Sequence, residues 1–425
     1  MNRSTVRELL APDAQVAPGE VLVPTEIGDP VRGPLRSPAA PLVAGTLRRK
    51  GTRVTFGPAG PCADPGDRRG GAALYVATCP QRDGSTAALA AAADPVDRVA
   101  VAAARSAVEE WSAVTGTRRL LAAEAPWCDG ATQALATIRA AVAGRDGGVY
   151  VYGEVAADPD AIAELAGQGV VFARSLDEVP AGGVLVFPAH GVPADVRAGA
   201  AARGLEVIDG TCPLVAGLHA EARTLAGRGD DLVLIGQPGH RAVAGIAGQA
   251  PGRTALVSSP GSTATLRVTD ARRVSYLLQP GIPVEDTAPV AAALRSRFPA
   301  VRGPQPDGFC YAASDRAESI RVIASACDAM FVVGAAGSPD SRHLCALARD
   351  RGARAHVIEQ AGDISADMLN GASAIGLAES TSAGPALARQ VTEALSGLGP
   401  LSVARRRVVT EVTGRPRVPE AFSPA

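Results

Sequence analysis

The stretch LEVIDGTCPLVAGLHAEARTLAGRGDDLVLIG, residues 205–236, contains one complete unit of the fold. It opens with a short apolar run at 205–209 and ends with a second apolar run at 231–236. Between them lies an Ala-, Leu- and Arg-rich segment that begins at Pro213. Apolar runs that are bounded by Gly or Asp and separated by a helical segment predict a strand, a helix and a second, parallel strand.

The same alternation covers the chain from residue 119 onward. Strands alternating with helices are typical of parallel sheets covered by helices, so the predicted fold class is α/β. At roughly 150 residues per domain, the 425 residues correspond to about three domains. The other runs that predict strands are 119–123, 148–152, 183–188, 274–279, 329–334, 354–359 and 373–378.

The composition excludes several classes of protein. Aromatic residues make up 3% of the chain, too few for a surface that stacks single-stranded nucleic acid. The formal net charge of -1 excludes a polybasic nucleic-acid binder and a highly charged disordered chain. The first ten residues carry charges, unlike a signal peptide, and no apolar run reaches about 18 residues. We therefore expect a cytoplasmic protein with neither a nucleic-acid nor a membrane partner.

Residues 1–116 differ from the rest of the chain. Seven prolines fall within residues 11–41 and interrupt any long helix there. We find no chemical motif in this segment and expect a partly ordered extension of unknown role. The predicted elements are strands at 52–56 and 72–77 and a helix that begins at Asp94-Pro95.

Three of the seven cysteines share one local context. Cys128, Cys212 and Cys310 each lie near a predicted helix N-terminus, where free N–H groups favour a thiolate. Segments of similar length separate them, as expected if each of three repeated α/β domains supplied one ligand. Three converging thiolates suit an iron–sulfur cluster with one open iron. The chain has no CxxC pair, so three unconnected core cysteines remain the alternative.

Two histidines lie in glycine-containing loops that follow predicted strands. His190 stands in PAHGV, residues 188–192, and His240 ends GQPGH, residues 236–240. Ligands of α/β proteins bind at the carboxyl ends of strands, where an imidazole can hold a phosphate or relay protons. The alternative is a loop histidine that caps backbone groups.

Around these residues the sequence resembles the 4-hydroxy-3-methylbut-2-enyl diphosphate reductases, the LytB (IspH) family. The resemblance covers about residues 120–418. The segments that carry it are AHGV at 189–192, DGTCPLV at 209–215, GH at 239–240 and FCYA at 309–312.

The resemblance implies three similar α/β domains around a central iron–sulfur cluster pocket, with an N-terminal extension. Each domain would give one cysteine to a [4Fe–4S] cluster, so Cys128, Cys212 and Cys310 would be its ligands, and the fourth iron would take the substrate hydroxyl. The implied boundaries are 1–116 for the extension, 117–212, 213–308 and 309–400 for the three domains, and 401–425 for a C-terminal tail.

The resemblance also implies a reaction and a substrate site. Enzymes of this family reductively remove the hydroxyl of an allylic diphosphate and yield isopentenyl and dimethylallyl diphosphates, in isoprenoid biosynthesis. The electrons would come from a donor such as ferredoxin or flavodoxin. His190, His240 and Ser382 would contact the diphosphate, although Ser382 alone is also typical of a helix N-cap. No catalytic residue is assigned.

Several positions depart from the family pattern. Gly153 and Ala157 stand where the family has histidines, and the family's His-Pro-Glu reads His240-Arg241-Ala242. The chain therefore lacks the carboxyl group that delivers a proton in the family. Each lost donor to a buried diphosphate removes about 1.5–3 kcal/mol. Arg241 and Arg342 can replace lost cationic contacts, but the sequence does not place them.

Three interpretations follow. The first is a divergent cluster-dependent reductase that acts on the same or a related allylic compound. The second is a non-catalytic iron–sulfur paralogue that senses redox state or carries electrons. The third is a scaffold whose first 116 residues bind a partner. The three cysteines disfavour the third, because an unused exposed thiolate is easily oxidised.

Overall fold

The computed structural model describes residues 5–63, 71–123, 128–143, 145, 148–153, 159–380, 383 and 386–410. The chain divides into two compact units, each of which contains segments that are distant in sequence. Unit 1 consists of Met1–Pro126 and Ser319–Arg407, and unit 2 of Trp127–Glu318 and Val408–Ala425.

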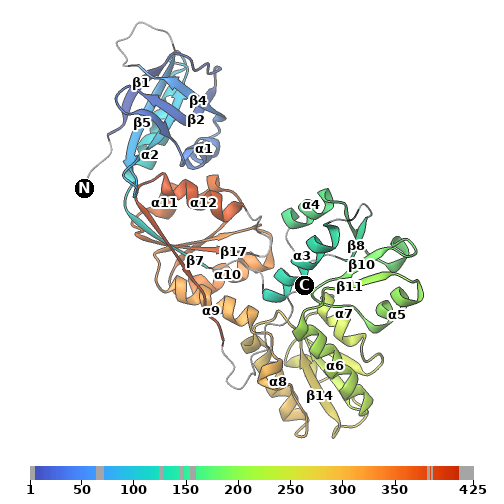
Figure 1. Ribbon diagram of the computed structural model, residues 1–425. Helices are drawn as coiled ribbons and strands as arrows, with labels where there is room; N and C mark the ends of the chain where they lie inside the picture. The colour runs from blue at the N-terminus through green and yellow to red at the C-terminus, as the bar shows by residue number, and fades with distance from the viewer. Residues whose placement is uncertain are drawn as a thin grey trace. The chain divides into compact units, whose positions relative to one another are not determined.

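A six-stranded sheet built from the N-terminal residues forms one part of unit 1 (Figure 1, blue). Its order is β1-β5-β6-β2-β3, with β4 paired to β2. All the pairs are antiparallel except the parallel pair of β2 and β4. The elements are β1 (Arg7–Ala11), β2 (Glu20–Asp29), β3 (Gly33–Arg36), α1 (Ala40–Arg49), β4 (Arg53–Pro61), β5 (Ala72–Pro80), β6 (Thr86–Ala93) and α2 (Arg98–Ala113).

The sequence predicted β4 and β5 but not the other four strands of this sheet. β2 contains Pro24, which is tolerated because the pairing with β4 shifts register between Pro24 and Glu26. β6 reads TAALAAAA, and alanine favours helices, but burial between its neighbours makes it a strand. The helix at Asp94-Pro95 begins later than predicted, because Asp97 is the N-cap whose side chain accepts the N–H groups of Val99 and Ala100.

The second sheet of unit 1 has five parallel strands in the order β16-β15-β17-β7-β18. Figure 1 shows β7, in teal, among the orange and red strands. The strands are β7 (Arg118–Ala123), β15 (Ala329–Val333), β16 (Arg354–Ile358), β17 (Ala374–Glu379) and β18 (Leu401–Arg406). The accompanying helices are α9 (Ala312–Ala324), α10 (Pro339–Arg349), the 3-10 turn η4 (Ala361–Asp363), α11 (Ala366–Leu369) and α12 (Leu387–Ser396).

Two strands of this sheet depart from the predicted boundaries. Residues 117–212 were assigned to one domain, but β7 pairs with β17 and β18. Residues 401–425 were assigned to a tail, but β18 is a strand of the same sheet. The boundaries follow from the resemblance, whose local motifs carry no information about which strands pair.

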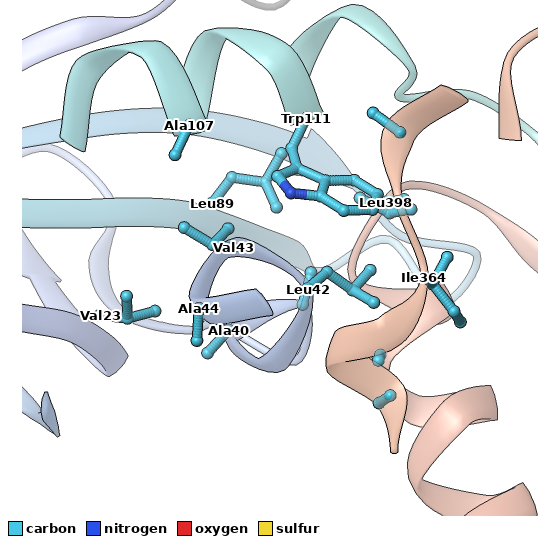
Figure 2. Close-up of a cluster of buried hydrophobic side chains, with 14 of the residues drawn as sticks. Val23, Ala40, Leu42, Val43, Ala44, Leu89, Ala107, Trp111, Ile364 and Leu398 are labelled. Atoms are coloured by element: carbon cyan, nitrogen blue, oxygen red, sulfur yellow. The ribbon is translucent and has the colours of Figure 1, made fainter. Parts of the chain in front are cut away.

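One hydrophobic core joins the two sheets of unit 1. Figure 2 shows Trp111 of α2 beside Leu398, with Leu42 of α1 and Ile364 nearby. All four side chains are fully buried in a single cluster. The indole Nε1 of Trp111 also donates to the Thr46 hydroxyl at 3.0 Å. The N-terminal residues are therefore an integral layer of unit 1.

Unit 2 contains two parallel sheets, of order β11-β10-β8-β9 and β13-β12-β14. The first is built from α3 (Asp129–Val142), β8 (Val149–Tyr152), α4 (Pro159–Gly167), β9 (Val170–Ala173), η1 (Leu176–Glu178), β10 (Val184–Phe187), α5 (Ala194–Ala202) and β11 (Glu206–Asp209). The second is built from α6 (Pro213–Gly227), β12 (Asp231–Ile235), α7 (Arg241–Ala247), β13 (Thr254–Val257), η2 (Gly261–Thr263), β14 (Val274–Leu278), α8 (Val284–Arg297) and η3 (Pro306–Gly308).

The predicted α/β class is confirmed, since three of the sheets are wholly parallel and carry intervening helices. Each of the nine strands predicted from residue 119 onward is present. Among the described residues, no helix combines the length and apolar character needed to cross a membrane.

Candidate functional site

The loop between β11 and α6 holds Cys212 against the loop of His190. The Asp209 carboxylate accepts the N–H of Thr211 at 3.0 Å and so shapes the turn before the cysteine. The N–H of Cys212 donates to the carbonyl oxygen of Ala189 at 3.0 Å. Cys212 is the N-cap of α6, and Pro213 fits the first turn of that helix because its fixed φ suits it.

Cys128 occupies the corresponding place before α3. It is the N-cap of that helix, and its Sγ accepts the N–H of Ala131 at 3.4 Å. The side chain is exposed. The predicted location of both cysteines at helix N-termini is therefore confirmed.

Gly130 brings the first two cysteines together. An ideal Cβ at this residue would lie 2.6 Å from the Sγ of Cys212 and 3.9 Å from the Sγ of Cys128. Both sulfur atoms therefore lie beside the same glycine, although the two residues belong to different loops. Only a residue without a side chain leaves room for Cys212 at this point.

Cys310 completes the group of cysteines in unit 2. It lies between η3 and α9 and is partly buried. Burial raises the pKa of its thiol, while hydrogen bonds from the backbone N–H groups of Ala312 and Gly281 act in the opposite direction. The charges of Cys128 and Cys212 raise this pKa further, so all three sulfur groups lie within electrostatic range of one another.

The arrangement fits a polynuclear cluster better than a single ion. Among the described residues, no three His, Cys, Asp or Glu side chains surround one point as the ligands of a single metal ion do. Thiolates that bind a four-iron cluster each contact a different iron and are therefore spread farther apart. The sulfur-rich donor set suits such a cluster.

Replacing Gly130 by alanine is expected to lower the iron content. The added Cβ would overlap the Sγ of Cys212, which must then move. We expect fewer irons per chain after anaerobic reconstitution than in the unaltered protein, measured by iron and sulfide analysis. Gly217→Ala in α6 is the matched control, because a Cβ at Gly217 meets open space. Equal iron contents in both variants would contradict the role of Gly130.

The two predicted histidines are neighbours. The ring centroids of His190 and His240 are 5.1 Å apart, and the rings lie edge to face. His240 is the N-cap of α7, and its Nδ1 accepts the N–H of Ala242 at 3.2 Å. Since Nδ1 is an acceptor, the neutral ring carries its proton on Nε2, which can donate to a ligand.

Both imidazoles are neutral at pH 7. Burial, together with the smaller effects of the nearby His240 and Arg241, lowers the pKa of His190 to about 4. Burial alone lowers the pKa of His240. The structure favours the neutral state, in which each ring is a hydrogen-bond donor without a positive charge.

A third histidine supports the loop of His190. His219 of α6 is buried, and an ideal Cβ at Gly191 would lie 2.6 Å from its Cε1. Gly191 has a φ of 66°, which glycine adopts without strain. His219 thus has a structural role.

Ser382 lies outside the described residues. Arg342 belongs to unit 1, where its guanidinium donates to the carbonyl oxygen of Gly337 at 2.8 Å.

The sequence analysis did not single out Gly130 or Gly281, two glycines that lie next to the cysteines. Gly130 could have been found from its position two residues after Cys128, but no local sequence pattern indicates Gly281.

One protein family matches most of the chain. The family model described as LytB protein matches residues 120–396. The 4-hydroxy-3-methylbut-2-enyl diphosphate reductase 1 of Mycobacterium tuberculosis (strain CDC 1551 / Oshkosh) is 40% identical over 296 residues, which are 69% of this chain and 90% of the relative. The reductase of Bordetella bronchiseptica is 38% identical and covers 67% of this chain and 87% of its own.

Solved structures show the same fold. The E-1-hydroxy-2-methyl-but-2-enyl-4-diphosphate reductase from Plasmodium falciparum matches 72% of this chain and 95% of its own, with a TM-score of 0.61 and 23% identity. The relatives are named as reductases, which agrees with the predicted oxidoreductase class. The family match and the sequence identities together show that the chain belongs to the LytB family.

Proposed function

We propose that this chain is an iron–sulfur reductase that removes the hydroxyl group of an allylic diphosphate in isoprenoid biosynthesis. The observation that carries the proposal is that the sulfur atoms of Cys128 and Cys212 lie beside Gly130 and that both groups act electrostatically on Cys310. The family membership and the names of the relatives support it.

The three cysteines would hold a [4Fe–4S] cluster. When bound, this group supplies electrons and one open iron for a substrate oxygen. The thiols must lose their protons on binding it, including Cys310, whose pKa is raised. The N–H groups of Ala131, Gly281 and Ala312 point at the sulfur atoms and would stabilise the resulting negative charge.

The two neutral histidines would bind the diphosphate. His190 and His240 each offer one N–H, and they lie in loops at the carboxyl ends of β10 and β12. Ser382 is proposed as a further hydroxyl donor on the family resemblance alone.

Turnover tests this proposal. The anaerobically reconstituted protein should convert 4-hydroxy-3-methylbut-2-enyl diphosphate to isopentenyl and dimethylallyl diphosphates with a reduced ferredoxin or flavodoxin as donor. Product formation is followed by mass spectrometry. A brown protein with full iron content that forms no product would contradict the proposed reductase activity. It would support a non-catalytic iron–sulfur paralogue.

One residue favours that second function. Ala242 is fully buried next to His240, at the position where the family pattern has a glutamate. No carboxyl group at this residue can deliver a proton to a leaving hydroxyl. A paralogue that senses redox state or carries electrons would need the cysteines but not this group.

Ala242→Glu is therefore expected to raise reductase turnover by at least about tenfold, because a positioned general acid contributes about a hundredfold or more. Burial raises the pKa of a carboxyl group, which keeps it protonated and ready to donate. The control is Ala242→Gln, which has the same size and the same packing cost but no acidic proton. Equal turnover by the two variants would contradict proton delivery from this position.

A further inference from the structure

Gly153 leaves a space that another residue fills. This glycine follows β8 and has a φ of 79°. An ideal Cβ at residue 153 would lie 1.4 Å from Nη1 of Arg241 and 2.6 Å from its Cζ. The guanidinium of Arg241 therefore lies where any side chain at residue 153 would begin, so the two residues share one space.

Arg241 brings a permanent positive charge to the histidine pair. It directly follows His240 in the chain, and its charge acts on both His190 and Tyr152. The negative charge of Asp195 acts on Tyr152 in the opposite direction and raises its pKa. Arg241 itself is exposed, and among the described residues no carboxylate lies within ion-pair distance of it.

The guanidinium of Arg241 differs chemically from the imidazoles of His190 and His240. The two imidazoles are neutral at pH 7, so they offer single hydrogen bonds without charge. A guanidinium remains charged at every physiological pH and presents a planar fork that fits two oxygens of a phosphate group.

We propose that Arg241, accommodated by the missing side chain of Gly153, is a diphosphate-binding residue of this chain. It supplies the positive charge that the two neutral histidines lack. The inference rests on the proposed function and deepens it: the substrate is a diphosphate ester, and its anionic end is held by Arg241, His190 and His240. The pair of Gly153 and Arg241 also explains why the loss of a histidine at residue 153 need not remove anion binding.

Binding of inorganic diphosphate tests the proposal without any turnover. Isothermal titration calorimetry of the reconstituted full chain should show that Arg241→Gln lowers the affinity about tenfold to a hundredfold, as expected for the loss of a charged hydrogen bond. Arg241→Lys should retain part of the affinity. Arg272→Gln is the matched control, since Arg272 is an exposed arginine of unit 2 in the turn that precedes β14, at the amino end of that strand.

A second variant tests the shared space. Gly153→Ala places a Cβ on the guanidinium and should weaken binding, and the double variant Gly153→Ala/Arg241→Gln should bind no more weakly than Arg241→Gln alone. Circular dichroism and thermal unfolding check that each variant is folded.

Two results would overturn the proposal: an unchanged affinity in Arg241→Gln, or no binding of inorganic diphosphate by the unaltered protein. Failure of the reductase is a separate result. In that case the allylic diphosphate is not converted, while inorganic diphosphate still binds in a manner that depends on Arg241.

Discussion

Cys212→Ser is expected to abolish the visible absorption of the anaerobically reconstituted protein. A neutral hydroxyl is a poor ligand for iron, and the loss of one of three protein ligands leaves the cluster held at only two corners. Cys212 lies next to Gly130 and within electrostatic range of Cys310, so no other described cysteine of unit 2 is placed to substitute for it. The measurement is the absorption spectrum together with iron and sulfide analysis.

Cys345→Ser is the matched control for this experiment. Cys345 is also a free cysteine, but it is buried in α10 of unit 1 and belongs to the core. Its replacement should leave the iron content and the spectrum unchanged. If Cys212→Ser keeps the full absorption, or if Cys345→Ser loses it, the assignment of the ligands is wrong.

Trp111→Ala is expected to destabilise unit 1 by about 3–5 kcal/mol, the usual cost of removing a large aromatic side chain from a core. Trp111 is fully buried where the N-terminal sheet and the parallel sheet share one core (Figure 2). Its indole N–H donates to the Thr46 hydroxyl. Replacement therefore leaves a cavity and removes one of the two hydrogen bonds that the Thr46 hydroxyl accepts, the other coming from Arg49. Thermal unfolding followed by far-UV circular dichroism measures the effect without relying on tryptophan fluorescence.

Val99→Ala in the same helix is the control for Trp111→Ala. Val99 is 81% exposed, so its truncation should change the free energy of unfolding by no more than about 0.5 kcal/mol. A shift as small for Trp111→Ala as for Val99→Ala would show that the N-terminal layer does not share a core with the rest of unit 1.

Nine of the twelve described parallel strands were predictable because each is a short apolar run next to a helical stretch. β9, β13 and β18 were not predicted. The sequence of the N-terminal sheet was harder to interpret. β6 is almost entirely alanine, and only its pairing with β5 and β2 makes it a strand. The membership of β7 in the second sheet of unit 1 depends on pairing with β17 and β18, which are more than two hundred residues away.

The candidate site was predictable where the chemistry is local. Cys128, Cys212, His190 and His240 all follow strands or precede helices, and the carboxyl ends of parallel strands gather such residues at one edge. Arg241 could not be placed, because its position depends on the absence of a side chain at Gly153, 88 positions earlier in the sequence. Nor does the sequence reveal the charge of the imidazoles, since burial determines it.

The most direct test of the cysteine cluster is a crystal structure of the anaerobically reconstituted protein, with iron located by anomalous scattering. We expect one iron–sulfur cluster bonded to the Sγ atoms of Cys128, Cys212 and Cys310, with one iron that has no protein sulfur ligand. The proposed function would be contradicted if iron were bound elsewhere in the chain, or if these three sulfur atoms lay too far apart to share one cluster.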